Sequence, residues 1–233
     1  MLIFTRCFNI FFINWAPYLK HKKMEMNILL VDDHIMTLEG YSSILNESNN
    51  TIHKAQNCQD VYNVLTKGLV FDVAIIDHNL PAYSEKKLHS GVDCALLIKK
   101  ANPNCKIILI TAHTEFIELY SMYKKVNPSA LIVKENLTVE IFRSIVYSSD
   151  RSTYFCDHVK QAIKFVTDKL PLLNETNTEI LMYLSKGFKI NELTDIIGLS
   201  KSAIQKRIAK MQLEFDVSDS SSLIKVMYEL NYV

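Results

Sequence analysis

Acidic, hydroxyl and amino side chains stand at the ends of four short apolar segments of this sequence. They are Asp32 and Asp33 after "NILLV", Asp77 after "VAII", Thr111 after "KIILI" and Lys134 after "LIV". Continuous apolar runs of this length are typical of strands buried on both faces of a parallel sheet. Because the carboxyl ends of parallel strands meet at one edge, where ligands bind, we expect these side chains to lie close together.

Such a cluster has the chemistry of a phosphoryl acceptor. Crowded carboxylates repel one another, and a hard divalent cation such as Mg²⁺, which prefers oxygen ligands, relieves that repulsion. One carboxylate can then attack a phosphoryl group and form an aspartyl phosphate, while the cation and a lysine ammonium neutralise the developing charge. A single acid at a strand end usually serves only a turn, so the prediction depends on the coincidence of all these residues.

The surrounding sequence predicts strands and helices in strict alternation. We expect five strands, at 27–33, 51–56, 72–77, 106–111 and 130–134, and five amphipathic helices, at 36–47, 59–68, 92–103, 115–126 and 139–149. Alternation of this kind predicts an α/β fold with a doubly wound, five-stranded parallel sheet. After Ser149 the pattern changes, and four further helices are expected from about Asn174 onward.

Composition and charge exclude several classes of protein. Hydrophobic residues make up 48% of the 233-residue chain, and the formal net charge is +1. The balance is that of a globular protein, and it excludes a chain that coats nucleic acid along its whole length. The five cysteines form no C-x-x-C pair, which argues against a disulfide framework or a zinc site and leads us to expect a cytoplasmic location.

The N-terminal extension, residues 1–25, is apolar and aromatic before it turns basic. Arg6, Asn9 and Asn14 interrupt the apolar run, which falls short of the roughly 20 apolar residues that a spanning helix needs. Two interpretations stay open. Either translation starts at Met24 or Met26, so that the extension is a gene-start error or a disordered tail, or it is a peripheral membrane anchor.

The motifs "LLVDDH", "AIIDHNLP", "LIT" and "LIVK" resemble those of the receiver domain of bacterial response regulators, which has the flavodoxin-like fold. We predict a receiver domain at 26–149. The resemblance implies that Asp77 is the phosphoacceptor, that Thr111 is the switch hydroxyl and that Lys134 contacts the phosphoryl group. The Mg²⁺ ligands that it implies are Asp32, Asp33, Asp77 and the backbone carbonyl of Asn79.

Two features depart from the receiver pattern. Receivers usually carry an aromatic residue three positions before the lysine, where this sequence has Leu131. They also place a glycine soon after the phosphoacceptor, whereas Gly91 follows Asp77 by 14 residues. The extra stretch lies within "AYSEKKLHS". One hypothesis is that it shapes kinase recognition, and the alternative is a tolerated surface insertion.

A second motif, "INELTDIIGLSKSAIQKRIAKM", predicts two helices joined by a short turn. Between Ser200 and Leu213 the sequence has four basic residues and no acid, in a chain that is nearly neutral overall. A basic helix face that also bears an amide suits the major groove of DNA. The candidate DNA-binding residues are Lys201, Ser202, Gln205, Lys206 and Lys210.

The C-terminal stretch is similar throughout to the LuxR-type DNA-binding domain, a small all-α domain of four helices with a helix-turn-helix. We predict this domain at 171–233 and a linker at 150–170. Residues that match the pattern are Glu179, Gly187, Glu192, Leu199, Ser200, Ile204 and Val217. Ala203, Arg207 and Asp216 depart from it, so no base preference is carried over. In that family the fourth helix often mediates dimerisation.

We therefore predict a two-component transcription regulator that a sensor histidine kinase phosphorylates on Asp77. The phosphorylated form is expected to be a homodimer on double-stranded DNA, with no enzymatic turnover, no small-molecule substrate and no membrane partner. One alternative is a DNA-binding regulator whose receiver binds a partner without being phosphorylated, and Leu131 favours it. The other is a magnesium-dependent phosphohydrolase, which would use a second acid at the position of Asn79.

Overall fold

The computed structural model describes residues 25–46, 50–148, 153–230 and 232. The prediction for the N-terminal extension lies almost wholly outside these residues. Within them, no helix is both long enough and apolar enough to cross a bilayer.

The receiver part contains one parallel sheet, in the strand order β2-β1-β3-β4-β5-β6. The five predicted strands are confirmed, and their buried side chains form the main hydrophobic core together with side chains of the flanking helices. A sixth strand of only two residues pairs with β5 through Leu131 and Phe155, and it is too short to give a periodic signal in the sequence. The strands are β1 (Asn27–Val31), β2 (Thr51–Ala55), β3 (Val73–Asp77), β4 (Lys106–Thr111), β5 (Ala130–Val133) and β6 (Tyr154–Phe155).

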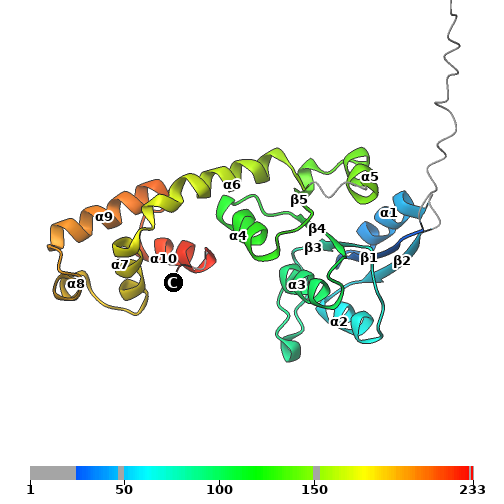
Figure 1. Cartoon of the computed structure of the whole chain (residues 1–233), viewed down its shortest axis with the longest axis horizontal. Helices are drawn as coiled ribbons and strands as arrows, with labels where there is room; N and C mark the ends of the chain where they lie inside the picture. Colours follow the sequence, from blue (N-terminus) through cyan, green and yellow to red (C-terminus); the bar gives the residue numbers. More distant parts are fainter. Residues whose placement is uncertain (1–24, 47–49, 149–152, 231, 233) are drawn as a thin grey trace, which may run out of the picture.

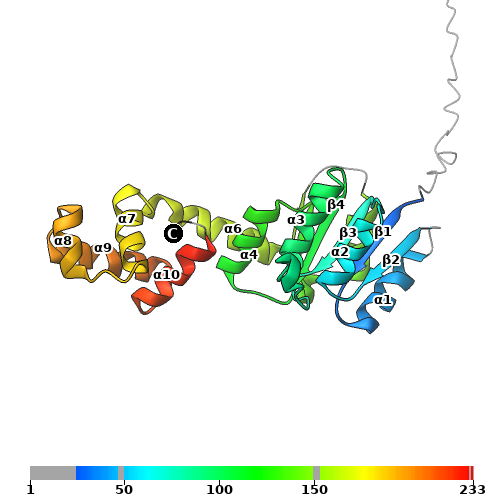
Figure 2. The same ribbon diagram turned by 90° about the horizontal axis from the view of Figure 1, so that it is seen from below.

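Helices cover both faces of this sheet, as the doubly wound prediction requires (Figures 1 and 2). α1 packs with α5, and α3 packs with both α2 and α4. Asn57 and Thr138 cap α2 and α5 by accepting backbone N–H groups of the first turn, which is the usual role of such side chains. These helices are α1 (Ile35–Leu45), α2 (Cys58–Thr66), α3 (Gly91–Ala101), α4 (Phe116–Val126) and α5 (Val139–Tyr147).

The rest of the described chain is helical. Most of the predicted linker forms a helix, α6, which packs along α4 and leads into the C-terminal helices (Figure 1). Asn174, Ser200 and Asp219 cap α7, α9 and α10, and a second hydrophobic core lies among these helices. The helices are α6 (Asp157–Lys169), α7 (Glu175–Ser185), α8 (Ile190–Ile197), α9 (Lys201–Glu214) and α10 (Ser220–Glu229). The exact domain boundaries stay predictions.

Candidate functional site

The carboxyl edge of the sheet brings together side chains from three strand ends. Lys134 Nζ lies 2.6 Å from Asp77 Oδ1 and 3.3 Å from Asp32 Oδ2. Asp77 is 4% exposed and Asp32 is 2% exposed. Two buried carboxylates therefore share one ammonium group, which offsets the cost of removing their charges from water.

The same contacts set the protonation of this cluster. Burial raises the pKa of Asp77 above its ordinary value of 3.8, and Lys134 offsets part of that effect. Burial lowers the pKa of Lys134, but the carboxylates of Asp77 and Asp32 outweigh it, so the net shift is upward. Lys134 is therefore held as a cation between these two carboxylates.

Hydrogen bonds connect the loop after β3 with the loop after β4 next to Asp77. The backbone N–H of Asn79 donates to Asp77 Oδ2 at 2.9 Å, and the Asn79 side-chain oxygen lies 3.1 Å from Nε2 of His113. The backbone N–H of His113 donates to the hydroxyl oxygen of Thr111, at 3.0 Å. Thr111 itself is fully buried at the end of β4.

Asp33 is placed differently from Asp32. It is more exposed, and its Oδ1 lies 2.7 Å from Nδ1 of His34. His34 also donates its backbone N–H to Asp32 Oδ1 at 2.9 Å. Asp32, Asp33 and His34 thus form a group whose ligand atoms lie within 4.8 Å of one another. Sequence reasoning missed His34, although it directly follows the acid pair in "DDH". Carboxylate oxygens of this kind fit a hard divalent cation.

The long connection after Asp77 is an ordered hairpin. Tyr83 and Leu88 pair through backbone hydrogen bonds of 2.7 and 3.2 Å, and Leu88 is buried against the receiver core. The tip includes the short helical turn η2 (Ser84–Lys86) and Lys87, whose φ of 56° lies in the left-handed region. The insertion therefore leaves the sheet edge and returns to it without disturbing β3.

The hairpin places Gly91 against the backbone of Asp77. The Gly91 N–H donates to the carbonyl of His78 at 2.8 Å. A Cβ at position 91 would lie 2.0 Å from the backbone oxygen of Asp77, so only glycine fits there. The unusual spacing of 14 residues thus reflects extra chain in the loop, because the glycine still meets the backbone of Asp77.

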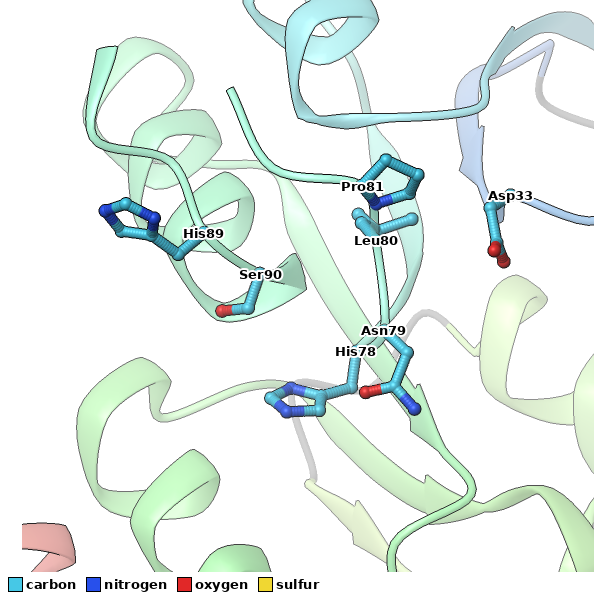
Figure 3. Close-up of a pocket in the computed structure, with 7 residues that line it drawn as sticks. All are labelled: Asp33, His78, Asn79, Leu80, Pro81, His89 and Ser90. Carbon is cyan, nitrogen blue, oxygen red and sulfur yellow. The ribbon is translucent and has the colours of Figure 1, made fainter. Parts of the chain in front are cut away.

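A shallow pocket of about 410 Å³ opens beside this edge. Figure 3 shows Asp33 on one side of Leu80 and Pro81, and the ring of His78 pointing away from Asp33. The lining residues are Asp33, His78, Asn79, Leu80, Pro81, His89 and Ser90. Both ends of the hairpin insertion therefore line the surface next to the buried acids.

The five candidate DNA-binding residues share one solvent-exposed face of α9. Lys201, Ser202, Gln205, Lys206 and Lys210 are all exposed. Their basic neighbour Arg207 instead turns inward, and its Nη1 donates to Asn177 Oδ1 on α7 at 2.9 Å. Arg207 was not among the predicted DNA-binding residues, but its partner Asn177 could not be predicted from the sequence.

Comparison with known proteins agrees with this organisation. The family model described as "Response regulator receiver domain" matches residues 28–146. "Response regulator UvrY" of Escherichia coli (strain K12) is 24% identical over 207 residues, covering 82% of this chain and 90% of that protein. "Response regulator protein VraR" of Staphylococcus saprophyticus is 20% identical over 216 residues, covering 90% of this chain and all of that protein.

A solved structure shares the fold of nearly the whole chain. It is RcsB from Salmonella enterica serovar Typhimurium bound to a promoter in the presence of the phosphomimetic BeF3⁻. The TM-score is 0.64 at 18% identity, and the match covers 89% of this chain and 100% of that one. Because the receiver model matches more than half of the sequence, the chain belongs to the response regulator receiver domain family, with a helical C-terminal domain attached.

Proposed function

We propose that this protein is a phosphorylation-controlled, DNA-binding transcription regulator of a two-component system, and that a sensor histidine kinase supplies the phosphoryl group to Asp77. The observation that carries the proposal is the buried contact of Asp77 and Asp32 with Lys134 at the edge of the sheet. Its support also includes the relatives, which are named response regulators, and the RcsB structure, which was determined with promoter DNA and the phosphomimetic BeF3⁻.

In the proposed reaction, a carboxylate oxygen of Asp77 attacks phosphorus as the bond from phosphorus to the donor breaks. Lys134 binds a phosphoryl oxygen, and the Thr111 hydroxyl donates a hydrogen bond to another. Bound Mg²⁺ would neutralise charge on the transferring group. The residues proposed to hold it are Asp32, Asp33, Asp77 and the backbone carbonyl of Asn79.

The proposed DNA contact is the exposed face of α9. Lys201, Lys206 and Lys210 supply positive charge to phosphates, while Ser202 and Gln205 can hydrogen-bond base edges. The Ser200 cap fixes the start of this helix, because its side chain accepts the N–H of Ala203. We propose that the DNA-bound form is a homodimer, because helix-turn-helix proteins commonly bind two half-sites as dimers.

Mass spectrometry of the intact protein with Mg²⁺ and acetyl phosphate tests the acceptor. We expect wild type to gain one phosphoryl group and Asp77→Ala to gain none. Asp168→Ala, which changes an exposed acid on α6, is the control and should behave as wild type. Modification of the Asp77→Ala protein would assign the phosphoryl group to another residue.

A second candidate function is DNA binding that does not depend on phosphorylation. Leu131 favours it, because this side chain is fully buried in β5 and replaces the aromatic residue that receivers usually move on activation. Normal DNA binding by a wild-type protein that takes up no phosphoryl group would support this candidate. A phosphohydrolase is disfavoured, since the position of a second acid is held by Asn79, whose amide faces His113.

A further inference from the structure

Leu131 cannot carry a signal by swinging in and out of the receiver. It is fully buried in β5, and it pairs with Leu109 of β4 on one side and with Phe155 of β6 on the other. If phosphorylation of Asp77 is felt in the C-terminal domain, other contacts must transmit it. The segment from Ala112 to Phe116, here called the connector segment, contacts both the region around Asp77 and helix α6.

On the receiver side, the connector segment is bonded to the phosphoacceptor region at two points. The His113 N–H donates to Thr111 Oγ1 at 3.0 Å, and the His113 ring lies 3.1 Å from the side-chain oxygen of Asn79. Movement of the Thr111 hydroxyl toward a phosphoryl oxygen would therefore pull on His113 directly. A further contact, of 2.6 Å, joins His113 Nδ1 to Glu118 in the first turn of α4.

On the other side, the connector segment is bonded to the start of α6. His158 donates from Nε2 to the carbonyl oxygen of Thr114 at 2.8 Å. The ring of Phe116 meets the rings of His158 and Phe165 edge-on, at centroid distances of 5.3 and 5.4 Å. One hydrogen bond and two aromatic contacts thus tie this segment to a single helix.

α6 leads into the C-terminal domain, and α4 packs against that domain through α10. Val166 of α6 and Tyr120 of α4 are buried in the second hydrophobic core, and Lys169 at the end of α6 pairs with Glu214 of α9 at 2.6 Å. Figure 1 shows α6 running along α4 toward α9, with α10 beside them. A shift at the first turn of α6 would therefore be passed along a packed helix to the proposed DNA-binding domain.

We propose that the connector segment transmits the phosphorylation state of Asp77 to α6, and that His158 is the positioning residue that receives it. The inference rests on the proposed function and adds the route that replaces the missing aromatic residue. It assigns a role to His158, which touches neither the acid cluster nor the exposed face of α9. It also predicts that a substitution at His158 removes the response of α6 and leaves phosphorylation of Asp77 unchanged.

Hydrogen exchange in the full-length protein, with and without beryllofluoride and Mg²⁺, tests the route. For wild type we expect the amides of 157–162 to change exchange rate by about 5- to 150-fold, the usual range of coupling between sites. In His158→Ala we expect a change below about twofold, with acetyl phosphate still modifying Asp77 at the wild-type rate. His158→Gln keeps a donor for Thr114 and should restore the response, and Lys164→Ala, an exposed change on α6, should leave it intact.

The outcomes separate this inference from the function on which it rests. A wild-type response in His158→Ala would overturn the route, and so would a phosphorylated wild type whose α6 exchange stays unchanged. If wild-type Asp77 is never modified, the proposed function fails, and the route fails with it. Should His158→Ala not fold, Phe116→Leu removes the two ring contacts while keeping an apolar side chain, and a loss of response there supports the route.

Discussion

The carboxyl edge of the sheet and the exposed face of α9 differ in the burial of their charged side chains. At the edge, the carboxylates of Asp32 and Asp77 are hidden from water, and each lies within 3.3 Å of Lys134 Nζ. On α9, Lys201 and Lys206 stand exposed. The first region depends on positions fixed by packing, whereas the second acts through its summed field. We therefore expect changes at the edge to abolish function and changes on α9 to weaken it by degrees.

The largest effect is expected at the tightest point of the edge, Gly91. In Gly91→Ala the new Cβ would overlap the Asp77 carbonyl, which lies 2.0 Å away. Relieving that overlap must move the end of β3, at an expected cost of about 3 kcal/mol or more in the free energy of unfolding. A displacement of about 1 Å should slow modification of Asp77 by acetyl phosphate roughly 100-fold.

Gly40 provides the control for this change. It lies inside α1, and an added Cβ there meets nothing within 4 Å. Gly40→Ala should stabilise the protein by about 0.5–1 kcal/mol, because alanine loses less conformational freedom in a helix. Denaturant unfolding followed by circular dichroism compares the two variants. Equal stability of both would show that the Asp77 carbonyl can move away without cost.

The second-largest effect on stability is expected at Arg207, the α9 residue that pairs with a buried partner as the residues of the sheet edge do. Its guanidinium donates to Asn177, which is 6% exposed. Arg207→Ala leaves that buried amide oxygen without this donor, and we expect a loss of about 1.5 kcal/mol in the free energy of unfolding. Lys206→Ala, one position earlier and exposed, should change stability by less than about 0.5 kcal/mol. Similar losses in both variants would remove Arg207 from the packing of this domain.

The sequence predicted the strands and their ends, but it did not predict which side chains would pair with one another. The strand ends were predictable, because buried parallel strands read as apolar runs and their carboxyl ends share an edge. The parallel sheet was confirmed, with β6 as an addition whose two residues carry no pattern. His34 and Arg207 could not be assigned in this way, since side-chain direction depends on partners that are distant in the sequence, such as Asn177.

The exposed lysines should give a smaller and graded effect. In Lys206→Ala, binding to a mixed-sequence DNA duplex should weaken at every sequence, and the slope of log affinity against log salt concentration should become shallower by about 1. Fluorescence anisotropy at several salt concentrations measures that slope. Lys164→Ala, on α6, serves as the control and should keep the wild-type slope. If Lys206→Ala also keeps it, this side chain is not at the phosphate backbone.

The smallest effect is expected at the sheet edge again, where His78 should make stability depend on pH. Burial, and to a lesser extent the charge of His113, lower the pKa of His78 from 6.5 to about 4, and none of the described residues hydrogen-bonds its buried Nδ1. The unfolded chain therefore takes up the proton first as pH falls, so wild type should lose stability between about pH 6.5 and pH 4. Because the ring is only half-buried, solvent screening should limit the loss to about 1 kcal/mol.

His78→Asn isolates this contribution, since asparagine does not titrate in that range. The stability of wild type relative to the variant should be constant above about pH 7 and should decline as the pH is lowered toward 4.5. Denaturant unfolding at a series of pH values measures the difference. A difference that stays constant would mean that His78 is as well solvated in the folded protein as in the unfolded chain. In that case the burial that characterises the sheet edge would end at Asp77 and would not include the next residue, His78.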